Sequence, residues 1–241
     1  NPTKNRLQSM NKKFNLSFAK QLDLADSLAK YTSYFNLPKH EGRNAIYFTG
    51  HSLGLQPKNY DFYLQQALED WKSMGVDGHF KAQTPWFDYH ESLAEGVASL
   101  VGAKRKEVVT MNGLSVNLHL LLTSFYQPTN KKHKILCEPN LFPSDLYVLR
   151  SQIELRGFDP DQALIFLPVN SDGVVSDDDL YSTIESNKDD LALIFLGGVN
   201  YYTGQVFNIE KITSIAHSYN IMVGFDLAHA AGNINLKLHE W

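Results

Sequence analysis

The feature that most constrains the fold is a repeated alternation of short apolar runs and amphipathic helical patterns in the second half of the chain. Runs typical of strands lie at 108–111, 134–137, 163–169, 191–196 and 221–225, and helical patterns lie between them at 116–125, 146–156, 177–186 and 209–219. Near-continuous apolar strands that alternate with helices are typical of a parallel sheet buried on both faces. The sequence therefore predicts an α/β fold with a mainly parallel sheet covered by helices on both faces.

The preceding part of the chain predicts mostly helices. Apolar side chains recur at roughly helical intervals over 14–34, and further helices are expected at 59–74 and 92–101. A short apolar run at 45–48 predicts a strand that leads into Gly50-His51-Ser52-Leu53-Gly54.

Composition narrows the class of partner. The formal net charge is −4, and Lys and Arg form no dense run, so the chain lacks the electrostatic footprint of a protein that binds nucleic acid or an anionic membrane. No apolar stretch approaches the roughly 18–20 residues of a membrane helix. The single cysteine, Cys137, lies in an apolar run and is expected to be a buried strand residue, which suits a reducing cytoplasm. A small-molecule partner is therefore expected.

Polar residues directly after the strands carry the functional information, because ligands of open α/β sheets bind at the carboxyl ends of the strands. Asn112-Gly113-Leu114-Ser115 precedes a helix and offers a hydroxyl and free N–H groups to a phosphate. The alternative is that Asn112 or Ser115 merely caps the helix, and for this motif alone the cap is favoured.

A second strand-end loop, 138–145, presents an aromatic ring and a carboxylate together. Phe142 is able to stack on a planar ligand. The alternative is that Phe142 belongs to the core and Asp145 caps the next helix, and for this loop alone that alternative is favoured.

The last strand ends in Asp226, with His229 three residues later. A carboxylate at the end of a central strand is costly to bury unless a cationic or hydrogen-bonding group meets it. The protonated ring nitrogen of pyridoxal phosphate is such a group. A metal site that includes Asp226 and His229 is the alternative, but the chain has no paired-ligand spacing that supports it.

The residues around Asp226, Gly224-Phe225-Asp226-Leu227-Ala228-His229-Ala230-Ala231-Gly232-Asn233, resemble the cofactor motif of kynureninases. Similar segments run in unbroken order from about Ala45 to Trp241: Gly50-His51-Ser52-Leu53-Gly54-Leu55-Gln56-Pro57, Met111-Asn112-Gly113-Leu114-Ser115-Val116-Asn117-Leu118-His119, Phe142-Pro143-Ser144-Asp145, Tyr202-Thr203-Gly204-Gln205 and Leu238-His239-Glu240-Trp241.

This resemblance implies the aspartate-aminotransferase-like fold, called fold type I among pyridoxal-phosphate enzymes, in a homodimer with active sites at the subunit interface. Residues 1–44 would form a helical lead-in that contributes to the small domain and dimer contacts. Residues 45–241 would form the cofactor-binding large domain, with its C-terminal part missing.

The resemblance also implies roles for individual residues. Leu114 and Ser115 would bind the phosphate, and Asp226 would pair with the ring nitrogen while His229 fixes the ring. In the loop Phe142-Pro143-Ser144-Asp145, Phe142 would stack on the ring and Asp145 would lie nearby. Ser52 and His79 would face the kynurenine side chain.

Three departures from the family pattern stand out. His51 replaces a common Asn, and Gly197 replaces a residue that often carries a hydroxyl. The family's Ser-Tyr-Lys segment, whose lysine forms the Schiff base with the cofactor, would follow shortly after Trp241. No catalytic residue is therefore expected within this chain, and the chain alone is expected to be inactive.

The implied reaction is hydrolysis of L-kynurenine, or of 3-hydroxykynurenine, to anthranilate or 3-hydroxyanthranilate and L-alanine, in tryptophan catabolism and NAD biosynthesis. One alternative is another fold type I enzyme such as a cysteine desulfurase. That family usually has Gln near the position of His229 and lacks the Gly-x-Ser-Leu-Gly-Leu-Gln-Pro segment. The other alternative is a non-catalytic, truncated partner protein.

Overall fold

The computed structural model describes residues 15–241, and the chain forms two compact units, one that ends at Thr84 and one from Pro85 to Trp241. No helix within the described residues is long and apolar enough to span a membrane.

The first unit begins with helix α2 (Leu16–Ala25) and the 3-10 helix η1 (Ala29–Tyr34). The single helix expected over 14–34 is therefore wrong as one element, and residue 14 lies outside the described residues. The interruption is at Asp26, whose backbone is extended and whose carboxylate accepts a hydrogen bond from the Leu28 N–H at 2.8 Å. An Asp side chain that bonds the backbone two residues later competes with helix continuation.

A short antiparallel pair, β1 (Lys39–His40) and β2 (Arg43–Asn44), follows. The strand expected over 45–48 is wrong, since pairing ends at Asn44, and residues Ile46 and Phe48 are 86% and 91% exposed. Helix α3 (Tyr60–Met74) confirms the predicted helix and continues into η2 (Gly75–Asp77) and α4 (Gly78–Lys81).

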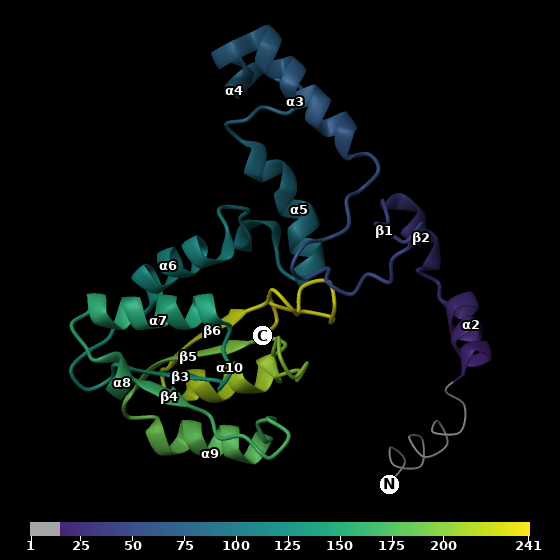
Figure 1. Cartoon of the computed structure of the whole chain (residues 1–241). Coiled ribbons are helices and arrows are strands. Elements are labelled where there is room, and N and C mark those ends of the chain that lie inside the picture. Colours follow the sequence, from purple (N-terminus) through teal and green to yellow (C-terminus); the bar gives the residue numbers. More distant parts are fainter. Residues whose placement is uncertain (1–14) are drawn as a thin grey trace. The chain divides into compact units, whose positions relative to one another are not determined.

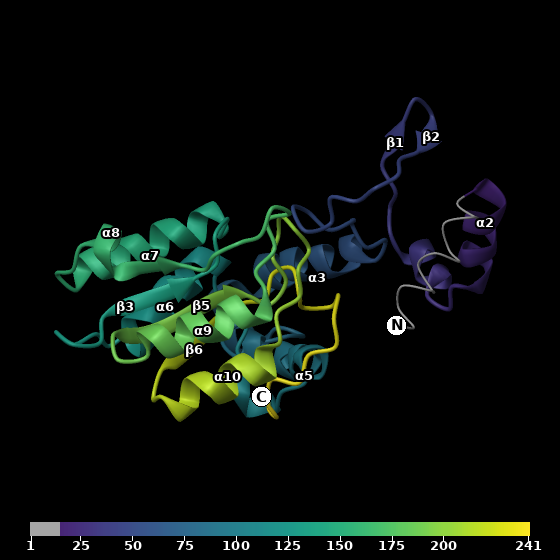
Figure 2. The ribbon, with the colours of Figure 1, turned by 90° about the horizontal axis from the view of Figure 1, so that it is seen from below.

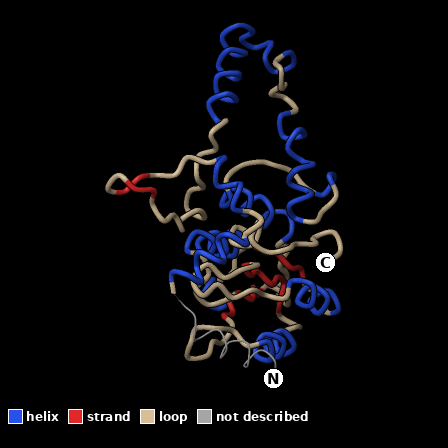
Figure 3. The backbone as a smooth tube through the Cα atoms, turned by 90° about the vertical axis from the view of Figure 1, so that its right-hand side faces the viewer, coloured by secondary structure: helices blue, strands red, loops and turns tan. Residues whose placement is uncertain are grey.

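The second unit contains a four-stranded parallel sheet in the order β4-β3-β5-β6. Its strands are β3 (Lys134–Cys137), β4 (Leu164–Phe166), β5 (Leu191–Gly197) and β6 (Met222–Asp226). The predicted strands in these four regions are confirmed, although β4 is shorter than expected. Figure 3 shows these strands enclosed by helices.

The fifth predicted strand, 108–111, is wrong. This described segment is irregular, and residues Val109 and Met111 are 55% and 48% exposed. An apolar run becomes a strand only when a neighbouring strand satisfies its backbone groups, and no described strand pairs with this one.

Helices cover both faces of the sheet. Helices α6 (Leu114–Phe125) and α7 (Pro143–Leu155) lie on one face, and α9 (Asp177–Asn187) and α10 (Ile209–Ser218) lie on the other (Figures 1 and 2). Successive side chains of a strand point to opposite faces of the sheet, so they pack alternately against the two layers of helices. Ile135 and Leu193 pack with α6 and α7, whereas Leu136 and Ile194 pack with α9 and α10, so the expected two-sided α/β fold is confirmed.

The remaining helices are α5 (Tyr89–Val101), η3 (Arg105–Glu107) and α8 (Pro160–Ala163). The chain after β6 returns to the end of α5, where the Leu238 N–H donates to the Val101 carbonyl at 3.1 Å and the His239 N–H donates to the Gly102 carbonyl at 2.9 Å. Gly102 ends α5 in the left-handed conformation, with φ of +65°. The segment that follows Asp226 is therefore tied to α5.

Candidate cofactor site

The carboxyl ends of three adjacent strands bring the polar residues of the site together. Glu138 follows β3 directly, Gly197 ends β5, and Asp226 ends β6 in register with Gly197. Parallel strands place their carboxyl ends at one edge of the sheet, where helix N-termini also converge. A pocket at this edge is lined by Glu138, Leu141, Phe142, Asp145, Gly197, Val199, Tyr201, Asp226 and His229.

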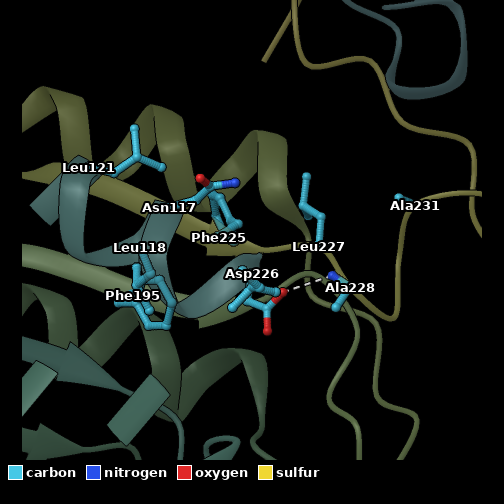
Figure 4. Close-up of a pocket in the computed structure, with 10 residues that line it drawn as sticks. Asn117, Leu118, Leu121, Phe195, Phe225, Asp226, Leu227, Ala228 and Ala231 are labelled. Atoms are coloured by element: carbon cyan, nitrogen blue, oxygen red, sulfur yellow. Dashed lines mark hydrogen bonds between the residues drawn. The ribbon is translucent and has the colours of Figure 1, made fainter. Parts of the chain in front are cut away.

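Asp226 is half-buried at this edge. Its Oδ1 atom accepts a hydrogen bond from the Ala228 N–H at 2.8 Å (Figure 4), and its backbone carbonyl accepts one from the Gly198 N–H at 2.8 Å. The second bond fixes the backbone at Asp226, and the first occupies one oxygen of its carboxylate. The carboxylate keeps further acceptor capacity, because an ionised carboxyl group has about four lone-pair sites.

Asp145 is the buried neighbour of Asp226, with 1% of the residue exposed. Its Oδ1 atom lies 3.4 Å from the Ser144 hydroxyl, and its Oδ2 atom is buried with no hydrogen-bond partner among the described groups. Burial, together with the carboxylate of Asp226, raises the pKa of Asp145 to about 7. The pocket therefore contains a buried acidic group with one oxygen that has no hydrogen-bond partner within residues 15–241.

The interpretation of Asp145 as a helix cap is wrong. Phe142 occupies the N-cap of α7, Pro143 is the first helical residue, and Asp145 lies in the first turn. Proline fits the first helical position because its missing N–H would have no partner there.

Phe142 is 44% exposed, so its interpretation as a core residue is also wrong. Its ring meets the Tyr201 ring edge to face, with 5.1 Å between the centroids. The ring of Tyr201 lies 6.2 Å from that of His229. The aromatic rings of Phe142, Tyr201 and His229 thus lie in the same pocket as the two aspartates.

Glu138, which sequence reasoning missed, is 3% exposed. Its Oε1 atom accepts from the Gly197 N–H and its Oε2 atom from the Asn200 amide, both at 2.9 Å. Burial raises the pKa of Glu138 and Asp226 adds to this, although the two hydrogen bonds oppose it. A Cβ atom at Gly197 would lie 2.9 Å from Oε1, so the bare glycine leaves room for this carboxylate.

A second cavity of about 390 Å³ lies beside Asp226, between α6 and the end of β6. Figure 4 shows Leu118 and Leu121 of α6 across from Phe225 and Leu227, with Asp226 at the cavity. The lining is mostly apolar and includes Leu114, the first residue of α6.

No side chain of the described residues caps the start of α6. Gly113 occupies the N-cap, without a capping side chain, and Ser115 is half-buried in the first turn. Asn117, also missed from the sequence, accepts from the Asn112 N–H at 3.2 Å and donates to the Asn112 carbonyl at 3.0 Å. The interpretation of Asn112 or Ser115 as the cap is therefore wrong, and N–H groups at the helix start remain available to an anion.

Ser52 and His79 belong to the first unit, where both are exposed. Ser52 lies in the turn after Thr49, whose carbonyl accepts from the Ser52 N–H at 3.0 Å, and His79 lies in α4. Their role toward a substrate stays a prediction. Within residues 15–241, no group of three or more His, Cys, Asp or Glu side chains is arranged to hold a metal ion.

Comparison with known proteins supplies the family. Residues 56–241 match the sequence profile of the family described as aminotransferase class-V. The chain belongs to the aminotransferase class-V family. In this class-V chain, the sheet edge with Asp226 and the start of α6 both lie within the matched region.

The resemblance of this class-V chain to kynureninases is also confirmed. It is 50% identical over 227 residues to the kynureninase of Flavobacterium psychrophilum, covering 94% of this chain and 53% of that protein. It is 42% identical over 236 residues to the kynureninase of Rattus norvegicus, covering 92% of this chain and 51% of that protein. The chain thus spans about half the length of these relatives.

Solved structures agree on the fold of this class-V chain. A C-DES mutant with glycine covalently linked to its PLP cofactor gives a TM-score of 0.64 at 15% identity, covering 88% of this chain and 52% of that one. The cysteine desulfurase CsdA of Escherichia coli gives 0.64 at 17% identity, covering 88% and 51%. Likeness at this identity shows the fold, whereas the much higher identity to kynureninases disfavours a desulfurase.

Proposed function

We propose that the protein to which this chain belongs is a kynureninase, a pyridoxal-phosphate-dependent hydrolase that cleaves L-kynurenine to anthranilate and L-alanine. The observation that carries the proposal is that Asp226 lies beside the buried Asp145 in a pocket that also contains Phe142 and His229. The 42–50% identity to kynureninases supports the same conclusion. By the same resemblance, we propose a homodimer that acts in the cytoplasm in tryptophan catabolism and NAD biosynthesis.

The carboxyl groups of this pocket suit the cationic ring nitrogen of pyridoxal phosphate. Three carboxylates, those of Glu138, Asp145 and Asp226, line the pocket, and among residues 15–241 no Lys or Arg does. The buried Oδ2 of Asp145 has no hydrogen-bond partner among the described groups. Buried acidic groups require a cation or a donor, and a protonated pyridine nitrogen provides both.

The start of α6 suits the phosphate. Its first N–H groups have no partner within the helix, and the helix dipole favours negative charge at this end. Leu114 and Ser115 would bind the phosphate there through their N–H groups and the Ser115 hydroxyl. The two hydrogen bonds between the Asn117 side chain and the Asn112 backbone hold this turn in place.

Bound pyridoxal phosphate supplies an electron sink for the electron pair released at the α-carbon of the substrate. Asp226 would hold the proton on the ring nitrogen, with Asp145 as the second carboxylate nearby. Phe142 would cover the ring and exclude water, His229 would orient it, and Pro143 and Ser144 would shape the loop. We propose Ser52 and His79 for the substrate side chain and place the Schiff-base lysine in the other half of the protein.

Turnover by the full-length protein tests this function. The protein is incubated with pyridoxal phosphate and, in separate reactions, with L-kynurenine, 3-hydroxykynurenine and L-cysteine. We expect anthranilate or 3-hydroxyanthranilate fluorescence with L-alanine release from the first two, and no sulfide from L-cysteine. A folded protein that binds the cofactor but releases no anthranilate or 3-hydroxyanthranilate overturns the kynureninase proposal, and sulfide release from L-cysteine supports a desulfurase instead.

A further inference from the structure

We infer that Glu138 is a positioning residue that sets the Tyr201 ring in the cofactor pocket by orienting Asn200. The inference rests on the proposed function of this pocket and adds residues to it. Glu138 and Tyr201 both line the pocket, and Asn200 connects them.

The first step is the fixed orientation of the Glu138 carboxylate. Both of its oxygens accept from N–H donors at 2.9 Å, one from Gly197 and one from Asn200. An ionised carboxylate accepts at both oxygens, whereas a glutamine amide in the same place would turn an NH₂ group toward one of these donors. The two donors therefore select a carboxylate at position 138.

The second step is the orientation of the Asn200 amide. Asn200 is 5% exposed, and because its NH₂ group donates to Glu138, its Oδ1 atom faces the following loop. Oδ1 accepts from the Tyr202 N–H at 3.0 Å, the Thr203 N–H at 2.8 Å and the Thr203 hydroxyl at 3.0 Å. One amide thus joins the buried carboxylate to the loop.

The third step is the placement of Tyr201, which lies between two residues of this network. The Asn200 N–H donates to the Gln205 carbonyl at 2.8 Å, and the Tyr202 N–H donates to Asn200 Oδ1 at 3.0 Å, so the backbone is held on both sides of Tyr201. Its ring meets Phe142 at 5.1 Å and lies 6.2 Å from His229, in the pocket that Asp226 also lines. Loss of the Glu138 carboxylate would remove the hydrogen bond that holds the Asn200 NH₂ group and would weaken the hold of this network on the Tyr201 ring.

A double-mutant cycle on the full-length holoenzyme tests the inference. Glu138→Gln, Tyr201→Ala and the double variant are compared with Glu154→Gln, an exposed glutamate on α7, as the control. The readouts are pyridoxal-phosphate affinity by absorbance titration and the visible circular dichroism of the bound cofactor. Far-ultraviolet circular dichroism verifies that each variant is folded.

We expect Glu138→Gln to weaken cofactor affinity by about tenfold, the scale of one lost hydrogen bond to a charged group, and to reduce the visible band. Because Glu138 acts through Tyr201, adding Glu138→Gln to Tyr201→Ala is expected to change neither readout further. The control is expected to match the parent.

Two results overturn the inference while the proposed function stands: parental affinity in Glu138→Gln, or effects of the two substitutions that multiply in the double variant. A folded parent that binds no pyridoxal phosphate overturns the proposed function itself. If Glu138→Gln does not fold, Asn200→Ala replaces it in the same cycle, with the same expected lack of additivity.

Discussion

Asp226 ends β6 beside the buried carboxyl group of Asp145, and burial together with this neighbour raises the pKa of Asp145 to about 7. In the unfolded chain an Asp titrates near 4. The folded protein therefore holds one more proton than the unfolded chain between these two pH values, so this group lowers stability as pH rises through that window.

Asp145→Asn removes this titration from the cofactor-free protein. We expect the free energy of unfolding of the variant, relative to the parent, to increase between pH 5 and pH 7, with a slope of at most about 1.4 kcal/mol per pH unit. Denaturant unfolding at several pH values measures it. The exposed Asp172→Asn is the control for the loss of one carboxylate elsewhere on the surface. A pH-independent difference for Asp145→Asn would contradict the raised pKa.

Position 102 requires a glycine because of its backbone conformation and because of the atoms packed against it. Its φ is +65°, and a Cβ atom there would overlap the Leu236 carbonyl oxygen and lie 2.7 Å from the Lys237 Cα. Gly157, with φ of +83°, has no atom within 4 Å of such a Cβ. We expect Gly157→Ala to lower the free energy of unfolding by about 1–2 kcal/mol, the strain of the left-handed conformation alone. Gly102→Ala should lower it clearly more in the same denaturant titration, and equal losses would contradict the close approach of 236–237.

Cys137 is fully buried in β3, as the sequence predicted, and burial raises the pKa of its thiol to about 12. Thiolates, not thiols, react with disulfide reagents. We expect no labelling of the native protein by such a reagent at pH 8 and complete labelling in denaturant. Rapid labelling of the native protein would show that this strand opens or is misplaced.

The sequence predicted strands correctly where an apolar run has neighbouring strands to pair with. The run at 134–137 became β3 because β4 and β5 flank it, whereas the similar run at 108–111 has no described strand beside it. Apolar pattern alone does not reveal pairing, since pairing depends on residues far away in the chain.

The same distinction applies to the site. Phe142, Asp145, Asp226 and His229 were predicted and line one pocket. Glu138 was missed because its partners, Gly197 and Asn200, are 59 and 62 residues away in sequence, and Tyr201 was missed with them. Both residues could have been found from their position at the carboxyl ends of strands, because Glu138 directly follows β3 and Tyr201 lies in the loop after β5.

The protonation state of the cofactor's ring nitrogen tests the central claim most directly. The full-length protein and its Asp226→Asn variant are loaded with pyridoxal phosphate labelled with ¹⁵N in the ring, and the nitrogen chemical shift is recorded between pH 6 and pH 9. Because the Asp226 carboxylate would stabilise the proton on this nitrogen, we predict the shift of a protonated pyridinium throughout this range in the parent and that of a neutral pyridine in the variant. A neutral pyridine shift in the parent, or the same shift in both proteins, would contradict the role of Asp226.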